Sequence, residues 1–223
     1  MFWEPFDLLT HLLHLALGFG AAGAALVALS ARKGGRLHRR AGWVFVAGMV
    51  IAAITAWLFM FARPLPLAMI EATVALYALG TALLALRPRR RGARAAEWAL
   101  FALLCLVMLG IGATAARLYL AGTPFFAAPA AFFVILAYFA ALDLRYLRAR
   151  EVARLDRVRR HALRMALAVS ETVRAPTITF ADQLGLPVPA IVFGSFLLVP
   201  LIYFAFAPAA RRAAAREVAA RAV

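Results

Sequence analysis

Two histidines near the start of the chain, His11 and His14, are the first residues whose type and spacing suggest chemistry. Residues three apart project from the same side of a helix, and small residues suited to close helix packing extend that side from Gly18 to Ala25. We therefore expect both imidazoles to face inward. They are interpreted as groups that bind a ligand or metal or relay a proton, or alternatively as simple hydrogen-bond partners of neighbouring helices.

Four charged residues are expected at a similar depth to these histidines: Glu71, Arg117, Glu171 and Arg174. Opposite charges away from water should pair, because an unpaired buried charge is costly. One interpretation is two structural ion pairs, Glu71 with Arg117 and Glu171 with Arg174. The other is a polar pocket, open to the outside, that admits a small polar or anionic molecule, since arginine binds carboxylates and phosphates in a fork.

A second group of polar residues is expected at the opposite edge: His38, Arg39, Arg160 and His161. Basic neighbours surround both histidines, so we expect contact with lipid headgroups or simple solvation there. The segment from Asp143 to Arg160 is expected to be a solvated helical extension with ion pairs between successive turns.

Sequence motifs of catalysis are missing from this chain. It contains no serine elbow, HExxH, Walker loop or dinucleotide fingerprint, so no catalytic residue is assigned and an enzyme is not favoured. Cys105 is the only cysteine and lies in an apolar run, which excludes a disulfide framework and a thiolate metal cluster. No metal site is predicted.

The elements that position these residues follow from hydropathy and charge. Hydrophobic residues make up 65% of the chain and its mean hydropathy is +0.86, values typical of a membrane protein. Seven apolar segments approach the roughly 20 residues that cross a bilayer. They are 8–29, 41–62, 67–86, 98–120, 125–144, 161–176 and 189–206. Lipid leaves helices as the sensible backbone, so we predict an all-α transmembrane bundle over residues 1–208, with a basic tail at 209–223.

The basic residues predict the orientation. Of the 25 lysines and arginines, 22 lie in the four clusters 32–40, 87–94, 145–164 and 211–221, between every second pair of apolar segments. Short cytoplasmic loops retain such residues, which places the N-terminus outside and the C-terminus in the cytoplasm. The net charge of +15 then favours anionic lipid headgroups as partners. Nucleic acid is not expected, because no groove-reading or base-stacking groups accompany the charge.

The sixth segment, HALRMALAVSETVRAP, is too polar to face lipid on all sides. Its polar face should point into the bundle. We expect Pro176 to end this helix and the following stretch, TITFADQLGLP, to form an outer loop; a kinked helix running on to Asp182 is the alternative.

The chain also resembles a bacterial multi-spanning family described only as a domain of unknown function. The likeness rests on an inward histidine in the first helix, on ARKGGRLHRRAGWVFVAGM before and within the second, and on RRHALRMALAVSETVR in the sixth. The matching positions are His11 or His14, Lys33, Gly34, His38, Arg39, Gly42, Met49, Arg160, His161, Met165 and Arg174. The resemblance implies a helical protein of the bacterial inner membrane and no activity.

Four functions stay open, the last of them an enzyme within the membrane that acts on a lipid or a lipid-linked substrate, with His and Glu side chains as acid and base. The favoured one is binding or transport of a small molecule or ion at His11, His14, Glu71, Arg117, Glu171 and Arg174. The second is a redox protein that uses b-type haem or a quinone, since His38 and His161 lie on different helices at one edge. The third is an assembly subunit, in a homo- or hetero-oligomer, without a ligand.

Overall fold

The computed structural model describes residues 4–62, 66–87 and 90–220, and this part of the chain is helical without any strand. The predicted all-α fold is therefore confirmed. The long helices are α1 (Glu4–Ser30), α2 (Arg36–Ala62), α3 (Pro66–Ala85), α4 (Arg91–Leu120), α5 (Ala127–Arg148), α6 (Arg154–Thr179) and α8 (Val188–Ala220). The short helix η1 (Pro124–Phe126) leads from α4 into α5, and the single turn α7 (Ala181–Leu184) leads from α6 into α8.

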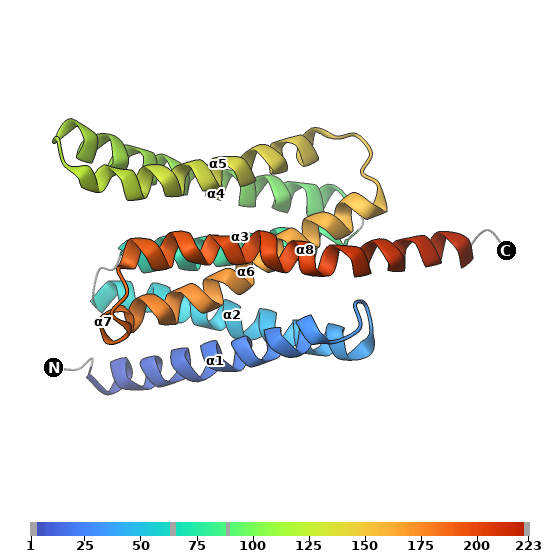
Figure 1. Ribbon diagram of the computed structural model, residues 1–223, viewed down its shortest axis with the longest axis horizontal. Coiled ribbons are helices and arrows are strands. Elements are labelled where there is room, and N and C mark those ends of the chain that lie inside the picture. Colours follow the sequence, from blue (N-terminus) through green and yellow to red (C-terminus); the bar gives the residue numbers. More distant parts are fainter. Residues whose placement is uncertain (1–3, 63–65, 88–89, 221–223) are drawn as a thin grey trace.

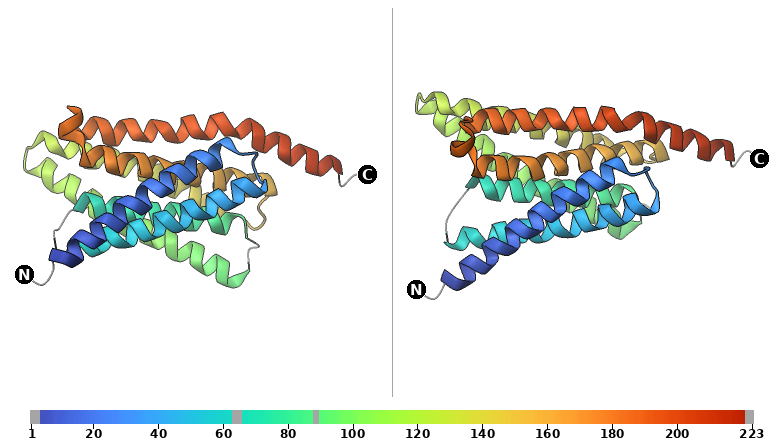
Figure 2. Two further views of the ribbon diagram at one scale, coloured as in Figure 1. Left: turned by 90° about the horizontal axis from the view of Figure 1, so that it is seen from below. Right: turned by 60° about the horizontal axis from the view of Figure 1, so that its bottom comes forward.

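The long helices lie roughly along one axis, and successive helices run in opposite directions (Figure 1). The passages from α1 to α2, α3 to α4 and α5 to α6 lie at the same end as the C-terminus (Figures 1 and 2). The described residues of the four basic clusters lie in these passages, in the helix ends beside them and in the last part of α8, so we call this the basic end. The charge sorting expected from the sequence is thus built into the fold.

In the part of the chain that the structure describes, six long helices have the length and apolar composition of membrane spans: α1, α2, α3, α4, α5 and α8. This supports a multi-pass membrane protein. The polar helix α6 packs against α8, α3 and α1, and its charged residues Arg164, Glu171 and Arg174 are buried. Its neighbours therefore cover the charges that would be costly in lipid. A seventh crossing through α6 stays a prediction.

The end of α6 differs from the expected one. The helix continues through Pro176 to Thr179, so the expectation that this proline ends it is wrong. Proline removes one N–H from the helix, yet the helix ends only beyond it, where the N–H of the capping residue Phe180 donates to the Pro176 carbonyl oxygen at 3.0 Å. The turn α7 follows at once, in the stretch that was expected to be an outer loop.

The backbones of α1 and α2 approach each other closely at Gly48, a glycine of α2. A Cβ atom added at Gly48 would lie 3.0 Å from the Ala21 Cβ and 3.1 Å from the Leu17 carbonyl oxygen. A Cβ added at Gly18 would have no neighbour within 4 Å. Ala21 and Ala25 are buried as expected, but Gly18 is not where the two helices approach each other most closely.

The described part of the predicted tail, residues 209–220, belongs to α8. The helix has no break at residue 208, and it projects past the other helices at the basic end (Figure 1).

Candidate functional site

One side of α6 carries most of the buried charge. Its residues recur at spacings of three and four, which keeps them on one side of a helix. In chain order they are Arg157, Arg160, Arg164, Leu167, Glu171 and Arg174. The charges form two groups, because the fully buried Leu167 lies between Arg164 and Glu171. Those two residues are separated by about 10 Å along the helix axis.

The first group, the Arg174 cluster, joins α6 to α3 and α8. Arg174 donates from Nε to Glu71 Oε1 on α3 at 2.8 Å, and from Nη1 to Ser195 Oγ on α8 at 3.2 Å. Its Nη2 donates to Glu171 Oε2, one turn earlier on α6. The guanidinium carbon lies 4.5 Å from the centre of the Phe196 ring. Each nitrogen of this buried guanidinium therefore has an acceptor.

The Arg174 cluster is not balanced in charge. It contains two carboxyl groups, those of Glu71 and Glu171, and one guanidinium, and all three side chains are buried. The second oxygen of Glu171, Oε1, is buried and has no hydrogen-bond partner among the described residues. With both carboxyls ionised, the cluster would carry one excess negative charge away from water, which is costly. The arrangement therefore suits the uptake of a cation.

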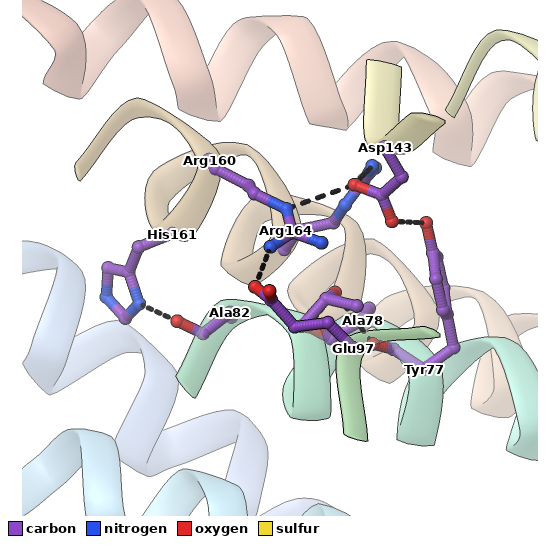
Figure 3. Close-up of polar contacts among 9 residues, drawn as sticks. Tyr77, Ala78, Ala82, Glu97, Asp143, Arg160, His161 and Arg164 are labelled. Carbon is purple, nitrogen blue, oxygen red and sulfur yellow. Dashed lines mark hydrogen bonds and ion pairs between the residues drawn. The ribbon is translucent and has the colours of Figure 1, made fainter. Parts of the chain in front are cut away.

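The second group, the Arg164 cluster, joins α6 to α3, α4 and α5 (Figure 3). Asp143 Oδ1 on α5 accepts from Arg160 Nε at 3.0 Å and from Arg164 Nη2 at 2.6 Å. Asp143 Oδ2 accepts from the Tyr77 hydroxyl on α3. Arg160 Nη1 donates to Glu97 Oε1 on α4 at 2.6 Å.

Aromatic rings complete the Arg164 cluster. The guanidinium carbon of Arg160 lies 3.9 Å from the centre of the Tyr146 ring, and that of Arg164 lies 4.7 Å from the centre of the Phe139 ring. Within the cluster the guanidinium groups of Arg160 and Arg164 match the carboxylates of Glu97 and Asp143. The cluster is therefore an electrically balanced joint between the α4–α5 hairpin and the rest of the bundle.

Sequence reasoning missed this joint. It treated Asp143 and Arg160 as solvated, whereas both are buried, and it did not single out Glu97, which is 1% exposed. The solvated interpretation holds for Asp156 and Arg159, an exposed pair 3.4 Å apart. A usable signal exists in the spacing: Glu97 shares the α4 contact stripe with Leu104 and Ile111, at intervals of seven residues.

Asp143 gives the same signal on α5. It occupies a buried stripe with Phe132, Leu136, Phe139 and Leu147, at steps of three and four. An acidic residue at a core position of an apolar helix requires a buried partner, and that partner is the basic face of α6.

Two histidines connect α1 and α2, one from each helix, and each contacts a backbone carbonyl of the other helix. His14 Nδ1 on α1 lies 3.0 Å from the Ala52 carbonyl oxygen of α2 and 2.9 Å from Thr55 Oγ1. Nearer the basic end, His38 Nδ1 on α2 lies 2.9 Å from the Ala28 carbonyl oxygen of α1. The hydrogen-bonding alternative considered for His14 is therefore present in the structure.

His161 connects α6 to α3 in the same way. Its Nδ1 lies 3.1 Å from the Ala82 carbonyl oxygen (Figure 3), and it is close enough to His38 to interact with it electrostatically. Lys33, in the connection between α1 and α2, donates to the Ala28 carbonyl oxygen at 3.2 Å. Partial burial lowers the pKa of this lysine. His38 and His161 are therefore held by backbone carbonyls rather than simply solvated.

The remaining predicted residues lie apart from the Arg174 cluster. His11 and Arg117 are exposed, so the expectation that both imidazoles of α1 face inward is correct only for His14. Glu71 pairs with Arg174 and not with Arg117. At the basic end Arg39 is exposed and donates to the Gly34 carbonyl oxygen at 2.6 Å.

No protein-family model, curated protein or solved structure matches this chain. Among the described residues, no three His, Cys, Asp or Glu side chains come together as a metal site. The candidate chemistry of the described residues lies in the two clusters on α6.

Proposed function

We propose that this chain is a multi-pass protein of the bacterial inner membrane that binds and transfers a proton at the Arg174 cluster. Of the ligands considered from the sequence, a proton suits this cluster best, because it needs no space beyond a carboxyl oxygen. One bound proton would leave one carboxylate beside one guanidinium, which removes the excess charge. Buried carboxyl groups in membrane bundles are characteristic of proton pathways.

The single observation that carries this proposal is the buried Glu171 Oε1, an acceptor without a hydrogen-bond partner in the described part of the chain. In the cluster, the charged groups that act on Glu171 are Arg174, which donates to its Oε2, and Glu71, which Arg174 also binds. Across the bundle, Thr172 next to Glu171 donates to Met49 Sδ on α2 at 3.2 Å. Among the described residues, Arg174 is therefore the one cation found beside Glu171 to stabilise a negative charge on its second oxygen.

Infrared spectroscopy of the purified protein tests whether a carboxyl group of the Arg174 cluster is protonated. A protonated carboxyl gives a carbonyl band that a carboxylate lacks. We expect this band near neutral pH in the wild type and its loss in Glu171→Gln, because Glu71 and Arg174 then balance each other. Asp156→Asn, which removes an exposed carboxyl on the same helix, is the matched control and should keep the band.

Proton transfer is tested separately in liposomes. A membrane potential should drive proton uptake through the wild-type protein, and Glu171→Gln should abolish it while Asp156→Asn should not. A carboxyl band without proton uptake would favour the assembly-subunit interpretation, in which the cluster only holds helices together.

A haem-binding redox protein is the second candidate, favoured by one observation. His38 and His161 lie on different helices within electrostatic range of each other, and each has Nδ1 at a backbone carbonyl oxygen. Such a bond fixes the ring and leaves Nε2 as the nitrogen for a metal. The visible absorption spectrum of the purified protein tests this candidate: a Soret band that disappears in His38→Ala and in His161→Ala would establish it.

A further inference from the structure

The first half of α6 carries buried hydrogen-bond donors for which the described residues supply no acceptor. Arg157, Arg160 and Arg164 recur at steps of three and four, so they share one side of the helix. In the part of the chain that the structure describes, four buried nitrogens on them have no acceptor: Arg157 Nε, Arg160 Nη2, Arg164 Nε and Arg164 Nη1.

Burial increases along this row. Arg157 is half-buried, Arg160 is 8% exposed and Arg164 is 1% exposed. The row therefore leads from the surface at the basic end to the interior of the bundle. Buried guanidinium groups normally have their donors paired, because a donor without a partner loses the hydrogen bonds that water would give it. Several unsatisfied donors on adjacent arginines indicate an acceptor group from outside the described part of the chain.

The charge count gives the sign of that group. Arg160 and Arg164 are matched by Glu97 and Asp143 through ion pairs of 2.6–3.0 Å. Among the described residues no ion pair is found for Arg157, so the row carries one positive charge in excess. The ligand that fits is an oxyanion, because guanidinium groups bind planar or tetrahedral oxygens with several parallel N–H bonds.

The surroundings favour the approach of an anion from the basic end. The first turn of α4, the last turn of α5 and the first turn of α6 all bring arginines to this end, among them Arg91, Arg145 and Arg154. Their summed positive potential raises the local concentration of anions. Phosphate is the oxyanion that both a membrane headgroup and the aqueous phase supply there.

We propose that Arg157, Arg160 and Arg164 form a phosphate-binding site at the basic end of α6, for a phosphate group that is either free or carried by a lipid. The site uses different residues from the Arg174 cluster, with Leu167 between them, and it does not depend on the proton-binding proposal. Phosphate would accept from the unsatisfied nitrogens of Arg157 and Arg160, the outer members of the row, and Arg164 would add its positive charge from the interior, while Asp143 and Glu97 keep the ion pairs they already make.

Binding measurements on the intact purified protein test the site with two probes. Inorganic phosphate is titrated calorimetrically at constant ionic strength against chloride, and phosphatidic acid is compared with phosphatidylcholine by native mass spectrometry. We expect one saturable equivalent from at least one of the two phosphate sources. Binding of the free ion alone identifies a soluble ligand, and binding of phosphatidic acid alone identifies a lipid headgroup.

Two matched variants separate the site from general attraction by the basic end. Arg157→Gln removes one guanidinium and its charge from the row without breaking any of the ion pairs described above, and it should weaken phosphate binding about tenfold. Arg159→Gln removes the same charge from an exposed neighbour and should leave the affinity within about twofold. Equal weakening in both variants, or no saturable binding of either phosphate source to the wild type, would overturn the proposal.

Discussion

Asp143 on α5 and Arg164 on α6 connect the α4–α5 hairpin to the interior of the bundle, with 2.6 Å between Asp143 Oδ1 and Arg164 Nη2. Both side chains are almost fully buried. The same carboxylate oxygen also accepts from Arg160 at 3.0 Å. One carboxylate therefore neutralises parts of two guanidinium groups, and its removal should affect more than a single ion pair.

Asp143→Ala should destabilise the protein strongly. It leaves Arg160 and Arg164 close together with only the Glu97 carboxylate between them, and stranding a buried charge costs about 3–5 kcal/mol. The midpoint of thermal unfolding in detergent measures the effect. Asp156→Ala is the control, because its exposed pair with Arg159 should contribute less than about 1 kcal/mol. Similar midpoints for the two variants would contradict the buried joint.

In the Arg174 cluster, loss of the guanidinium should lower the stability of the protein more than loss of one carboxylate. Arg174→Met leaves two buried carboxyl groups without a cation and should lower stability by about 3–5 kcal/mol. Glu171→Gln leaves one guanidinium and one carboxylate, so the folded protein should be retained. Unfolding midpoints of both variants give the comparison. A larger loss in Glu171→Gln than in Arg174→Met would show that the excess charge is not where we place it.

The overall helical architecture and the charge sorting were predictable because they depend on composition along the chain. The basic clusters and the apolar runs can be counted directly, and six helices match the runs in length and apolar character. Pairing partners were less predictable, since they depend on which helices are neighbours. Glu71 was expected to find Arg117, but α3 packs against α6, so it pairs with Arg174 across 103 residues of sequence.

The rotation of α1 shows the same limit. Three residues of spacing put His11 and His14 within about 60° of each other on the helix, but the edge of the buried face falls between them. His14 is held by α2 and His11 is exposed. A hydrophobic pattern cannot locate that edge in a helix that is apolar on all sides, because lipid-facing and buried residues have the same character.

His14→Ala should therefore lower the stability of the folded protein more than His11→Ala does. The first removes the group 3.0 Å from the Ala52 carbonyl oxygen and 2.9 Å from Thr55 Oγ1, and loss of such bonds is worth about 1 kcal/mol. The second changes an exposed side chain. Unfolding midpoints of the two single variants, measured in the same detergent, check the order. A larger effect at His11 would mean that α1 is rotated relative to the structure.

Gly48→Ala should destabilise the α1–α2 pair, whereas Gly18→Ala should not. The added methyl group at Gly48 would lie 3.0 Å from the Ala21 Cβ and 3.1 Å from a backbone oxygen of α1, and at Gly18 it would meet no atom within 4 Å. Overpacking of this kind costs about 1–3 kcal/mol. In Gly18→Ala the better helix propensity of alanine should instead give a small gain, up to about 1 kcal/mol. Thermal midpoints distinguish the two, and equal tolerance would indicate that the helices can move apart.

The orientation in the membrane follows from where the fold gathers the arginines. The passages from α1 to α2, α3 to α4 and α5 to α6 lie at one end together with the C-terminus (Figure 1). Basic residues near short loops stay on the cytoplasmic side. Reporter fusions after Arg40, Arg94, Arg150 and Val223 should all report the cytoplasm. A fusion after Gly122, in the turn that follows α4 at the opposite end, is the control and should report the outside. A cytoplasmic signal from that turn, or an outside signal from any of the four, would contradict the crossing of α6 or the assigned direction.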